Sequence, residues 1–250
     1  KLKSGQVTDD TSMSLALGEA ILASGGRVDP LACAEAFDAW MRRKPVDIGN
    51  TVRRNLLTFR RTGVPVAPAS DHDAGNGAAM RVLPVALATF GQSEAAVRTA
   101  GQAQAHVTHN NVVSDAVCQF LTLAVQDLLR ACSLEEMLGH HLGALLAAHP
   151  ELSFRGRPRR ENPSGWVVET LQAVLQGLVG GDGFEDCLVD VVNRGGDADT
   201  TGAIAGMLAG ALYGPQAIPK RWLKALDADI ADRSREQARA RLPLAACQVA

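Results

Sequence analysis

The stretch Asn193-Arg-Gly-Gly-Asp-Ala-Asp-Thr-Thr-Gly-Ala-Ile-Ala-Gly-Met-Leu-Ala-Gly-Ala-Leu-Tyr-Gly214 joins an acidic turn to a long run of small apolar residues. Asp197 and Asp199 supply two carboxylates, and Thr200 and Thr201 supply two hydroxyls. A short oxygen-bearing side chain at a helix start can accept from free backbone N–H groups. We therefore predict a helix that begins here, capped by Asp199 or Thr200.

Glycine recurs at every fourth position of this predicted helix, at Gly202, Gly206, Gly210 and Gly214. Each glycine costs about 0.8–1.0 kcal/mol relative to alanine in an exposed helix, so the stripe predicts close approach of a neighbouring helix. A membrane span is the alternative, because small residues four apart also join transmembrane helices. The run is rich in Ala and Gly and directly follows two aspartates, and no other segment is expected to reach the ~20 apolar residues of a span. No integral membrane span is predicted.

The composition favours an all-α protein, and 250 residues suit one large domain or two small ones; we predict a single domain over residues 1–250. Hydrophobic residues make up 46% of the 250 residues and aromatic residues only 4%, so the core must consist largely of Ala, Leu and Val. The net charge is −2 with interspersed signs, which argues against nucleic acid and anionic lipid as partners. Five dispersed cysteines without a C-x-x-C pair do not form a disulfide framework, and no secretory signal is visible. A reducing, cytoplasmic location is expected.

A second acidic cluster, Thr8-Asp-Asp-Thr11, precedes a helical stripe that begins at Met13 and stops at Gly25-Gly26. Capping of that helix explains the cluster when it is taken alone. If the two clusters met in space, they would supply four carboxylates, and buried carboxylates need partners. Ligation by oxygen alone suits Mg²⁺ or Mn²⁺ rather than Zn²⁺, so the two clusters together predict a metal site.

Other polar positions are open to two interpretations. Asp47 lies in a loop between two predicted helices, where an acid is more often a cap than a catalyst. Gly75-Asn-Gly77 closes a Pro-rich loop and permits close backbone approach to a ligand, although Asn-Gly is usually only a turn. Pro84 should kink the apolar helix that follows.

The histidines and the long connector give weaker signals. His106 and His109 could share a helical face and bind a transition metal, but no third soft ligand accompanies them. His140, His141 and His149 are expected to be surface or packing residues. Residues 151–165 contain four arginines and form either a solvated connector or a mobile lid. Ser133-Leu-Glu-Glu136 predicts a capping box.

The two acidic motifs resemble the metal signatures of the ADP-ribosylglycohydrolase family. Thr8-Asp-Asp-Thr11 with Met13 matches one signature, and Gly196-Asp-Ala-Asp-Thr-Thr-Gly-Ala-Ile-Ala-Gly206 matches the other. The resemblance covers nearly the whole chain and extends to the bacterial dinitrogenase reductase-activating branch. It runs through residues 1–7, Arg43-Lys-Pro-Val-Asp-Ile-Gly-Asn50, Asp73-Ala-Gly-Asn-Gly-Ala-Ala-Met-Arg81 and Thr108-His-Asn110.

The resemblance implies an all-helical fold whose cleft holds two Mn²⁺ or Mg²⁺ ions. The implied metal ligands are Thr8, Asp9, Asp10, Asp197, Asp199 and Thr200, and the implied catalytic acids are Asp47, Asp9 and Asp10. The residues implied to border ADP-ribose are Asn50, Gly75, Asn76, Gly77, Met80 and His109, with Trp166 near the adenosine end. The implied reaction removes ADP-ribose from ADP-ribosylarginine on a target protein, in this branch the nitrogenase iron protein. A nitrogen-signalling regulatory protein is a further implied partner.

The chain departs from the family pattern in three places. Family members begin with a Gly-Asp-Ala-Leu-Gly-like helix followed by a glutamate, and this chain starts after that point, so one acid of the site is expected to be missing. Asn111 stands where relatives often carry a second histidine, and residues 151–165 are unusually rich in arginine. Two alternatives stay open: a hydrolase of another ADP-ribosyl linkage, and a non-catalytic relative that binds ADP-ribose as a regulatory protein.

Overall fold

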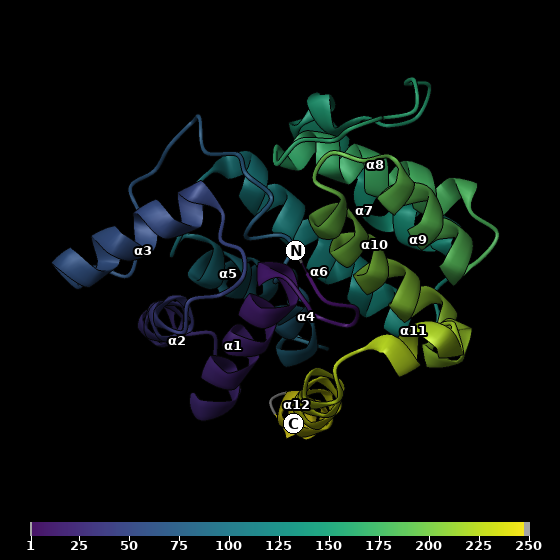
Figure 1. Ribbon diagram of the computed structural model, residues 1–250. Coiled ribbons are helices and arrows are strands. Elements are labelled where there is room, and N and C mark those ends of the chain that lie inside the picture. Colours follow the sequence, from purple (N-terminus) through teal and green to yellow (C-terminus); the bar gives the residue numbers. More distant parts are fainter. Residues whose placement is uncertain (1, 248–250) are drawn as a thin grey trace.

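Helix α6 (Val112–Leu129) lies at the centre of an all-helical fold and packs against α4, α5, α7, α8 and α10 (Figure 1). The computed structural model describes residues 2–247, with side chains through residue 240. Within these residues it contains twelve α-helices and no strand. The others are α1 (Asp9–Ala23), α2 (Pro30–Arg42), α3 (Asn50–Thr62), α4 (Leu83–Ala88), α5 (Glu94–Ala105), α7 (Leu134–Ala148), α8 (Val167–Gly180), α9 (Phe184–Asn193), α10 (Ala198–Tyr213), α11 (Lys220–Ala225) and α12 (Ala228–Cys247), with short 3₁₀ turns at Pro150–Leu152 and Pro215–Ala217.

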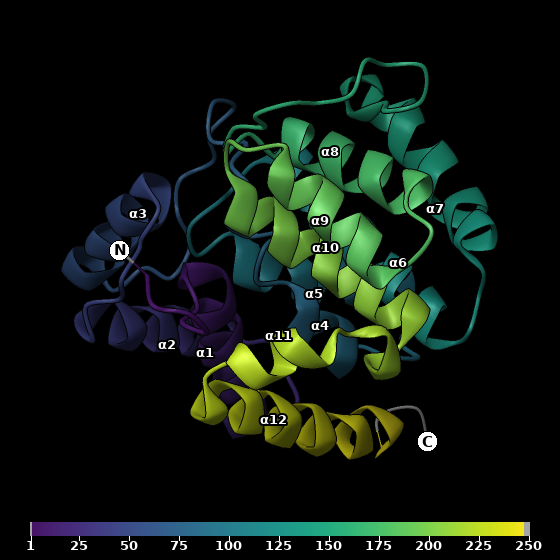
Figure 2. The same cartoon turned by 45° about the vertical axis from the view of Figure 1, so that its right-hand side comes forward.

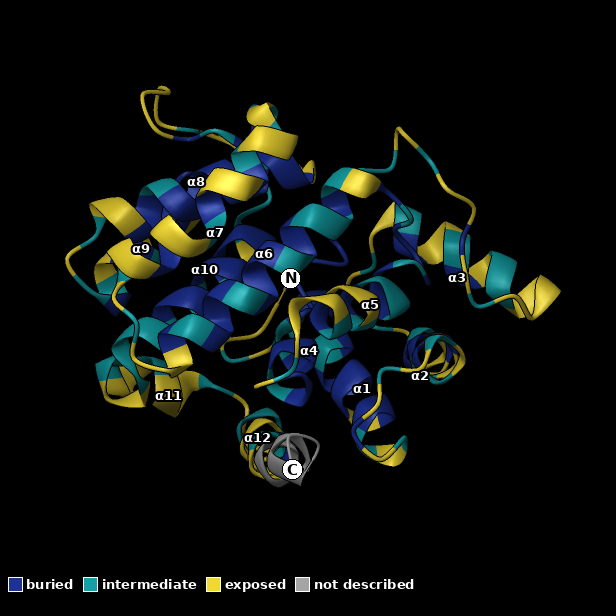
Figure 3. Cartoon of the chain, turned by 180° about the vertical axis from the view of Figure 1, so that it is seen from behind, coloured by how far each residue is buried: buried dark blue, intermediate teal, exposed yellow. Residues whose placement is uncertain are grey.

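The central position of α6 explains its apolar sequence. By length and composition it could cross a membrane, so the prediction that no segment approaches a span was wrong for Val112–Leu129. In the fold, however, α6 is a core helix whose buried residues run from Ser114 to Leu128. Figure 3 shows its surface largely buried, whereas the outer faces of α3 and α9 are exposed. The core around it consists mainly of Ala, Val and Leu, as the composition predicted.

Two helices carry the acidic clusters and contact each other. Helix α1 packs against α2, α4, α10 and α12, and α10 packs against α6, α8 and α9. Figure 2 shows α12 as a long outer helix lying beside α1 and α4. Since α1 begins at Asp9 and α10 begins at Ala198, the contact between these two helices joins segments from opposite ends of the chain.

The acidic residues do not act as side-chain caps, which corrects three predictions. Asp197, not Asp199 or Thr200, is at the N-cap of α10, and its side chain makes no cap hydrogen bond. Thr8 is at the N-cap of α1, again without a side-chain cap bond. Gly49 precedes α3, so Asp47 is not a cap either. The capping interpretation therefore leaves these carboxylates unexplained.

Two further local predictions were wrong. Pro84 lies in the first turn of α4 instead of kinking a longer helix, because a residue without an N–H is tolerated at a helix start. Of the glycines within α10, only Gly202 is tightly packed: an added Cβ would lie 3.0 Å from Val192 Cγ2. A Cβ at Gly206 would lie 3.9 Å from Leu188, and one at Gly210 would meet open space.

Candidate active site

The acidic clusters meet where α1 and α10 begin. Asp9 and Asp10 form the first turn of α1, and Asp199 lies in the first turn of α10. One carboxylate oxygen from each of the three residues lies within 4.8 Å of the other two. Asp9 and Asp10 are buried, whereas Asp199 is exposed. The structure thus brings together side chains about 190 positions apart in the sequence, as the two motifs predicted.

A tight turn fixes the position of Asp197. Gly195 and Gly196 have φ values of 76° and 64°, a left-handed conformation that favours glycine. A Cβ at Gly196 would overlap the carbonyl oxygen of Pro163, and the backbone N–H of Asp197 donates to that same carbonyl at 2.7 Å. The turn therefore rests directly against the connector at residues 162–163.

The side chain of Asn76 orients Asp197. Its amide nitrogen donates to Asp197 Oδ2 at 2.7 Å and to the Thr170 hydroxyl at 3.0 Å. The backbone N–H of Asn76 donates to the Gly165 carbonyl at 3.0 Å. The resemblance placed Asn76 beside ADP-ribose; in the structure Asn76 lines the cleft, and its buried side-chain amide hydrogen-bonds to Asp197.

The clustered carboxylates disfavour one another's ionised forms. Burial raises the pKa of Asp10 to about 7, and the charges of Asp9 and Asp199 add to the rise, while hydrogen bonding from Thr8 and Thr200 opposes it. Burial likewise raises the pKa of Asp9, with Asp47 contributing next, and burial also raises that of Asp197. Without a compensating positive charge, this arrangement is electrostatically costly.

The donor atoms fit a hard divalent cation. Asp10 Oδ2 accepts from the Thr8 hydroxyl at 2.7 Å, while Asp10 Oδ1 is buried and has no hydrogen-bond partner. An orphaned buried carboxylate oxygen requires an explanation, and a cation beside Asp9, Asp10 and Asp199 supplies one. All three donors are oxygen atoms, the ligand type that Mg²⁺ and Mn²⁺ prefer.

A cleft of about 250 Å³ opens above the acids. Asp9, Asp197, Asp199 and Thr200 line one side, and Asp47 and Asn50 line it from the loop before α3 and from the first residue of α3. Asp47 is exposed, and its Oδ1 accepts from the backbone N–H of Ile48 at 2.7 Å. The other predicted residues that line the cleft are Gly75, Asn76, Gly77, Met80 and His109.

His109 forms a fixed wall of this cleft. Its Nδ1 lies 2.8 Å from the Thr108 hydroxyl, which also accepts from Arg81 at 2.8 Å. If the Thr108 hydroxyl donates its hydrogen to Nδ1, the N–H of the neutral ring is on Nε2. Burial, together with the nearby Arg81 charge, lowers the pKa of His109 to about 3, so the ring is neutral.

Glycines are required next to this ring. A Cβ at Gly77 would lie 2.7 Å from His109 Cε1, and a Cβ at Gly75 would lie 3.0 Å from Nε2. The close approach leaves backbone rather than side chains on this wall of the cleft. The sequence identified these glycines, but it did not reveal that His109 is the group requiring them.

Arg81 is the residue whose role the sequence did not show. It is fully buried, and its guanidinium donates to the Gln104 side chain, the Gln104 carbonyl and Thr108 and stacks on Phe37 at 4.2 Å. Burial lowers its pKa to about 10, so it remains charged. A buried cation near Asp9 that holds Thr108 supports both the acidic cluster and the histidine wall.

Two predicted site residues lie at the margin of the cleft. Thr8 hydrogen-bonds to Asp10, and Trp166 is 46% exposed. Trp166 is joined to the cleft through an isolated backbone bridge to Gly75. Asn111, at the position of the expected histidine, caps α6 by accepting from Val113 and Ser114.

His106 and His109 do not form a metal site together, in agreement with the lack of a third soft ligand in the sequence. His106 lies 2.8 Å from Asp115, whereas His109 is held by Thr108. The two rings therefore belong to different hydrogen-bond networks.

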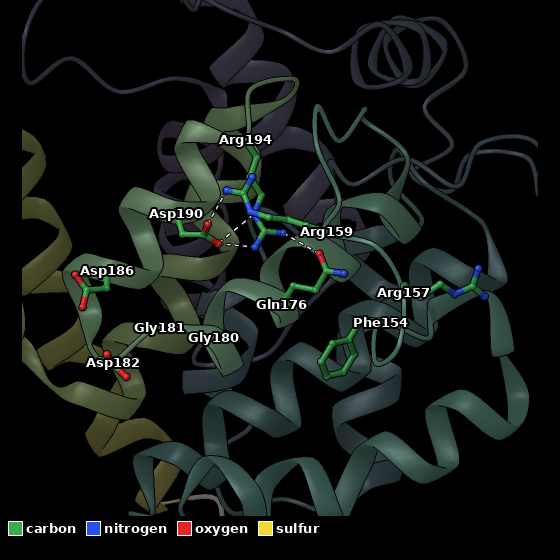
Figure 4. A pocket seen from close by; sticks show the side chains of 10 residues that line it. All are labelled: Phe154, Arg157, Arg159, Gln176, Gly180, Gly181, Asp182, Asp186, Asp190 and Arg194. Carbon is green, nitrogen blue, oxygen red and sulfur yellow. Dashed lines mark hydrogen bonds and ion pairs between the residues drawn. The ribbon is translucent and has the colours of Figure 1, made fainter.

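Residues 151–165 form a connector that is tied to the body. Figure 4 shows a second hollow, of about 600 Å³, in which Arg159 and Arg194 converge on Asp190. Arg194 also donates to Gln176 at 2.9 Å, and Arg160 donates to Gln172 at 2.9 Å. These contacts favour the connector over the lid interpretation, and they show that Arg159 and Arg160 anchor the chain.

Comparison with known proteins agrees with this geometry. The ADP-ribosylglycohydrolase family model matches residues 2–248. The chain belongs to the ADP-ribosylglycohydrolase family. A similar curated relative is the ADP-ribosyl-[dinitrogen reductase] glycohydrolase of Rhodospirillum rubrum, 45% identical over 98% of this chain and 82% of the relative. ADP-ribosylarginine hydrolase Tri1 of Serratia proteamaculans is 32% identical over 90% of this chain, which spans 64% of that relative.

A solved structure shares the fold. The chain named ADP-ribosylglycohydrolase-related protein complex superposes with a TM-score of 0.84 and 34% sequence identity, covering 96% of this chain and 82% of the other. The all-α architecture predicted from composition is thus confirmed. Membership of this glycohydrolase family makes the chain an enzyme of the hydrolase class.

Proposed function

We propose that this ADP-ribosylglycohydrolase removes ADP-ribose from ADP-ribosylated arginine on a target protein. The observation that carries the proposal is the convergence of Asp9, Asp10 and Asp199 beside a cleft lined by Gly75 and Gly77. Relatives named for dinitrogen reductase and for ADP-ribosylarginine support the arginine linkage. We further propose that the target is nitrogenase iron protein, that a nitrogen-signalling protein regulates the enzyme, and that the enzyme acts in the cytoplasm.

The acidic cluster would hold two divalent ions, Mn²⁺ or Mg²⁺. We assign Thr8, Asp9, Asp10, Asp197, Asp199 and Thr200 as the residues that hold them. When bound, the ions would neutralise the clustered carboxylates and polarise oxygen atoms of the substrate. Asn76 keeps one oxygen of Asp197 in place, so it acts as a positioning residue.

The cleft residues outside the acidic cluster would bind the sugar and donate the proton. The backbone at Gly75 and Gly77 lets the substrate approach closely, and His109 offers a neutral N–H donor from Nε2. Asp47 is an exposed acid on the loop before α3, and its charge raises the pKa of Asp9. Cleaving an N-glycosidic bond requires a proton for the leaving guanidine, and Asp47 is the group we assign to that transfer.

Linkage specificity is the decisive test. The purified chain should be incubated with Mn²⁺ and matched proteins carrying ADP-ribose on arginine, on serine or on glutamate, and released ADP-ribose should be measured by chromatography. We expect release from the arginine-linked protein, and loss of that release in Asp199→Asn. Release only from another linkage would refute the arginine assignment. Tight ADP-ribose binding without release from any linkage would favour the non-catalytic alternative.

A further inference from the structure

A second cluster of metal-ligating side chains lies at the turn between α6 and α7. Asp127, Cys132 and His140 each place one donor atom within 4.8 Å of the other two. His140 Nδ1 lies 2.7 Å from Asp127 Oδ2, and His141 Nε2 lies 3.0 Å from the same oxygen. One carboxylate oxygen thus faces two imidazoles and a thiol, and the reaction in the cleft uses none of these groups.

The local backbone creates this arrangement. Helix α6 ends at Leu129, and Ala131 adopts a φ of 64°, which is uncommon for a residue with a Cβ. That turn brings the chain back on itself, so that the N–H of Cys132 donates to the Asp127 carbonyl at 3.1 Å. A complete capping box at Ser133 then begins α7, which carries His140 and His141.

The donor types differ from those of the acidic cleft. A thiolate, an imidazole nitrogen and a carboxylate oxygen are the ligands of Zn²⁺ and of similar borderline-soft ions, whereas Mg²⁺ and Mn²⁺ prefer oxygen alone. The carbonyl end of α6 also favours a positive charge. Arg130 contacts Asp127 through Oδ1 at 3.4 Å, so Oδ2 remains directed at the histidines.

The cluster is accessible and remote from the cleft. The His140 side chain is 54% exposed and Cys132 is half-buried, so an ion can enter from solvent. At the other end of α6, the Ser114 hydroxyl donates to the carbonyl of Gly75 in the cleft wall. Asp127 lies thirteen positions after Ser114 in the helix, a distance of roughly 20 Å at ~1.5 Å per residue.

We propose that Asp127, Cys132 and His140 form a binding site for a borderline-soft divalent transition metal such as Zn²⁺, distinct from the oxygen-lined cleft. His141 holds the Asp127 carboxylate by its hydrogen bond and orients it toward the ion. With three ligands from this chain, the fourth tetrahedral position is open to water. Ligands from both α6 and α7 make the ion a cross-link between the two helices.

Cobalt spectroscopy separates this site from the cleft. Metal-free protein should first receive saturating Mn²⁺, which occupies oxygen ligands, and then one equivalent of Co²⁺. A thiolate bound to Co²⁺ gives a near-ultraviolet charge-transfer band that oxygen ligands cannot give. We expect this band in the parent, its loss in Cys132→Ser, and at least a tenfold weaker Co²⁺ affinity in His140→Gln. His149→Gln, which changes a histidine that lies beside Glu151 instead, is the matched control and should keep the band.

Stability provides a second readout in the same proteins. Zn²⁺ should displace Co²⁺, abolish the band and raise the melting temperature of the parent but not of Cys132→Ser. Absence of a thiolate band in the parent would overturn the proposal. So would a band that persists in Cys132→Ser, because it would come from another cysteine. Neither the Co²⁺ band nor the melting temperature depends on hydrolysis, so both test the metal site even if the proposed hydrolase activity is not found.

Discussion

Replacing Asp10 with asparagine should stabilise the metal-free protein while removing its response to metal. Asp10 is 3% exposed, its Oδ1 has no partner, and burial with nearby Asp9 and Asp199 raises its pKa from 3.8 to about 7. The pKa of Asp10 is higher in the folded state than in the unfolded state, so its contribution to the free energy of unfolding is greatest below about pH 4, where Asp10 is protonated in both states. This contribution is lost as the pH rises through 7. Asparagine keeps the shape but cannot ionise.

The magnitude follows from the pKa difference. A rise of about three units corresponds to roughly 4 kcal/mol at pH 8, at ~1.36 kcal/mol per unit. At pH 5 the carboxyl is still protonated in the folded state, and the cost falls to roughly 1–2 kcal/mol. A domain of this size shifts its melting temperature by about 2–4 °C per kcal/mol, so metal-free Asp10→Asn should melt about 8–16 °C above the parent at pH 8 and only a few degrees above it at pH 5.

Differential scanning fluorimetry with and without Mn²⁺ tests this directly. At a hundredfold excess over Kd, a bound ligand stabilises the folded state by about 2.7 kcal/mol, so Mn²⁺ should raise the parent's melting temperature by about 5–10 °C. The variant, which lacks a negative charge at the site, should hardly respond. Equal Mn²⁺ shifts in parent and variant, or a metal-free variant that melts below the parent at pH 8, would refute the reasoning.

The remaining predictions concern the proton-transfer acid, the histidine wall and the packing of α10. Asp47→Asn should keep the Mn²⁺ shift and lower kcat by about 10²–10⁴-fold; turnover near the parent value would remove Asp47 from the reaction. Gly77→Ala should raise KM for the ADP-ribosylated substrate about tenfold or more, because its Cβ would lie 2.7 Å from His109; exposed Gly143→Ala in α7 is the control and should leave KM unchanged. Gly202→Leu should lower the free energy of unfolding by about 1–3 kcal/mol, because the new side chain overpacks against Val192. Gly210→Ala should raise it slightly, because its Cβ meets open space. Chemical denaturation measures both, and an unchanged free energy of unfolding in Gly202→Leu would contradict close packing at Gly202.

The sequence predicted that the two acidic clusters meet, because each is a recognisable group of Asp and Thr residues at the start of a helix. Asp and Thr residues at two helix starts exceed what capping requires, and the N-cap residues Thr8 and Asp197 make no side-chain cap bond. The all-α class followed from composition and was confirmed. The assignment of metal and substrate contacts to individual residues rests on the family resemblance and remains a prediction.

Tertiary contacts decided the features that the sequence did not reveal. His109 appeared as one histidine of a pair, but its ring is held by the neighbouring Thr108, and Arg81 reaches Thr108 only in the folded chain. The three glycines within α10 look equivalent in sequence, yet among them only Gly202 faces a close side chain. Asp127 and the two histidines of α7 were passed over because Ala131, an ordinary residue, makes the turn that joins them.

The most direct test of the central claim is metal-dependent release of ADP-ribose from arginine. The parent chain should be stripped with a chelator, dialysed, and assayed on an ADP-ribosylarginine protein over a series of Mn²⁺ concentrations. We expect no release of ADP-ribose without metal. Activity should return over the same range of Mn²⁺ concentrations that raises the melting temperature. Full activity in the stripped protein, or activity that Mn²⁺ fails to restore while the melting temperature rises, would contradict it.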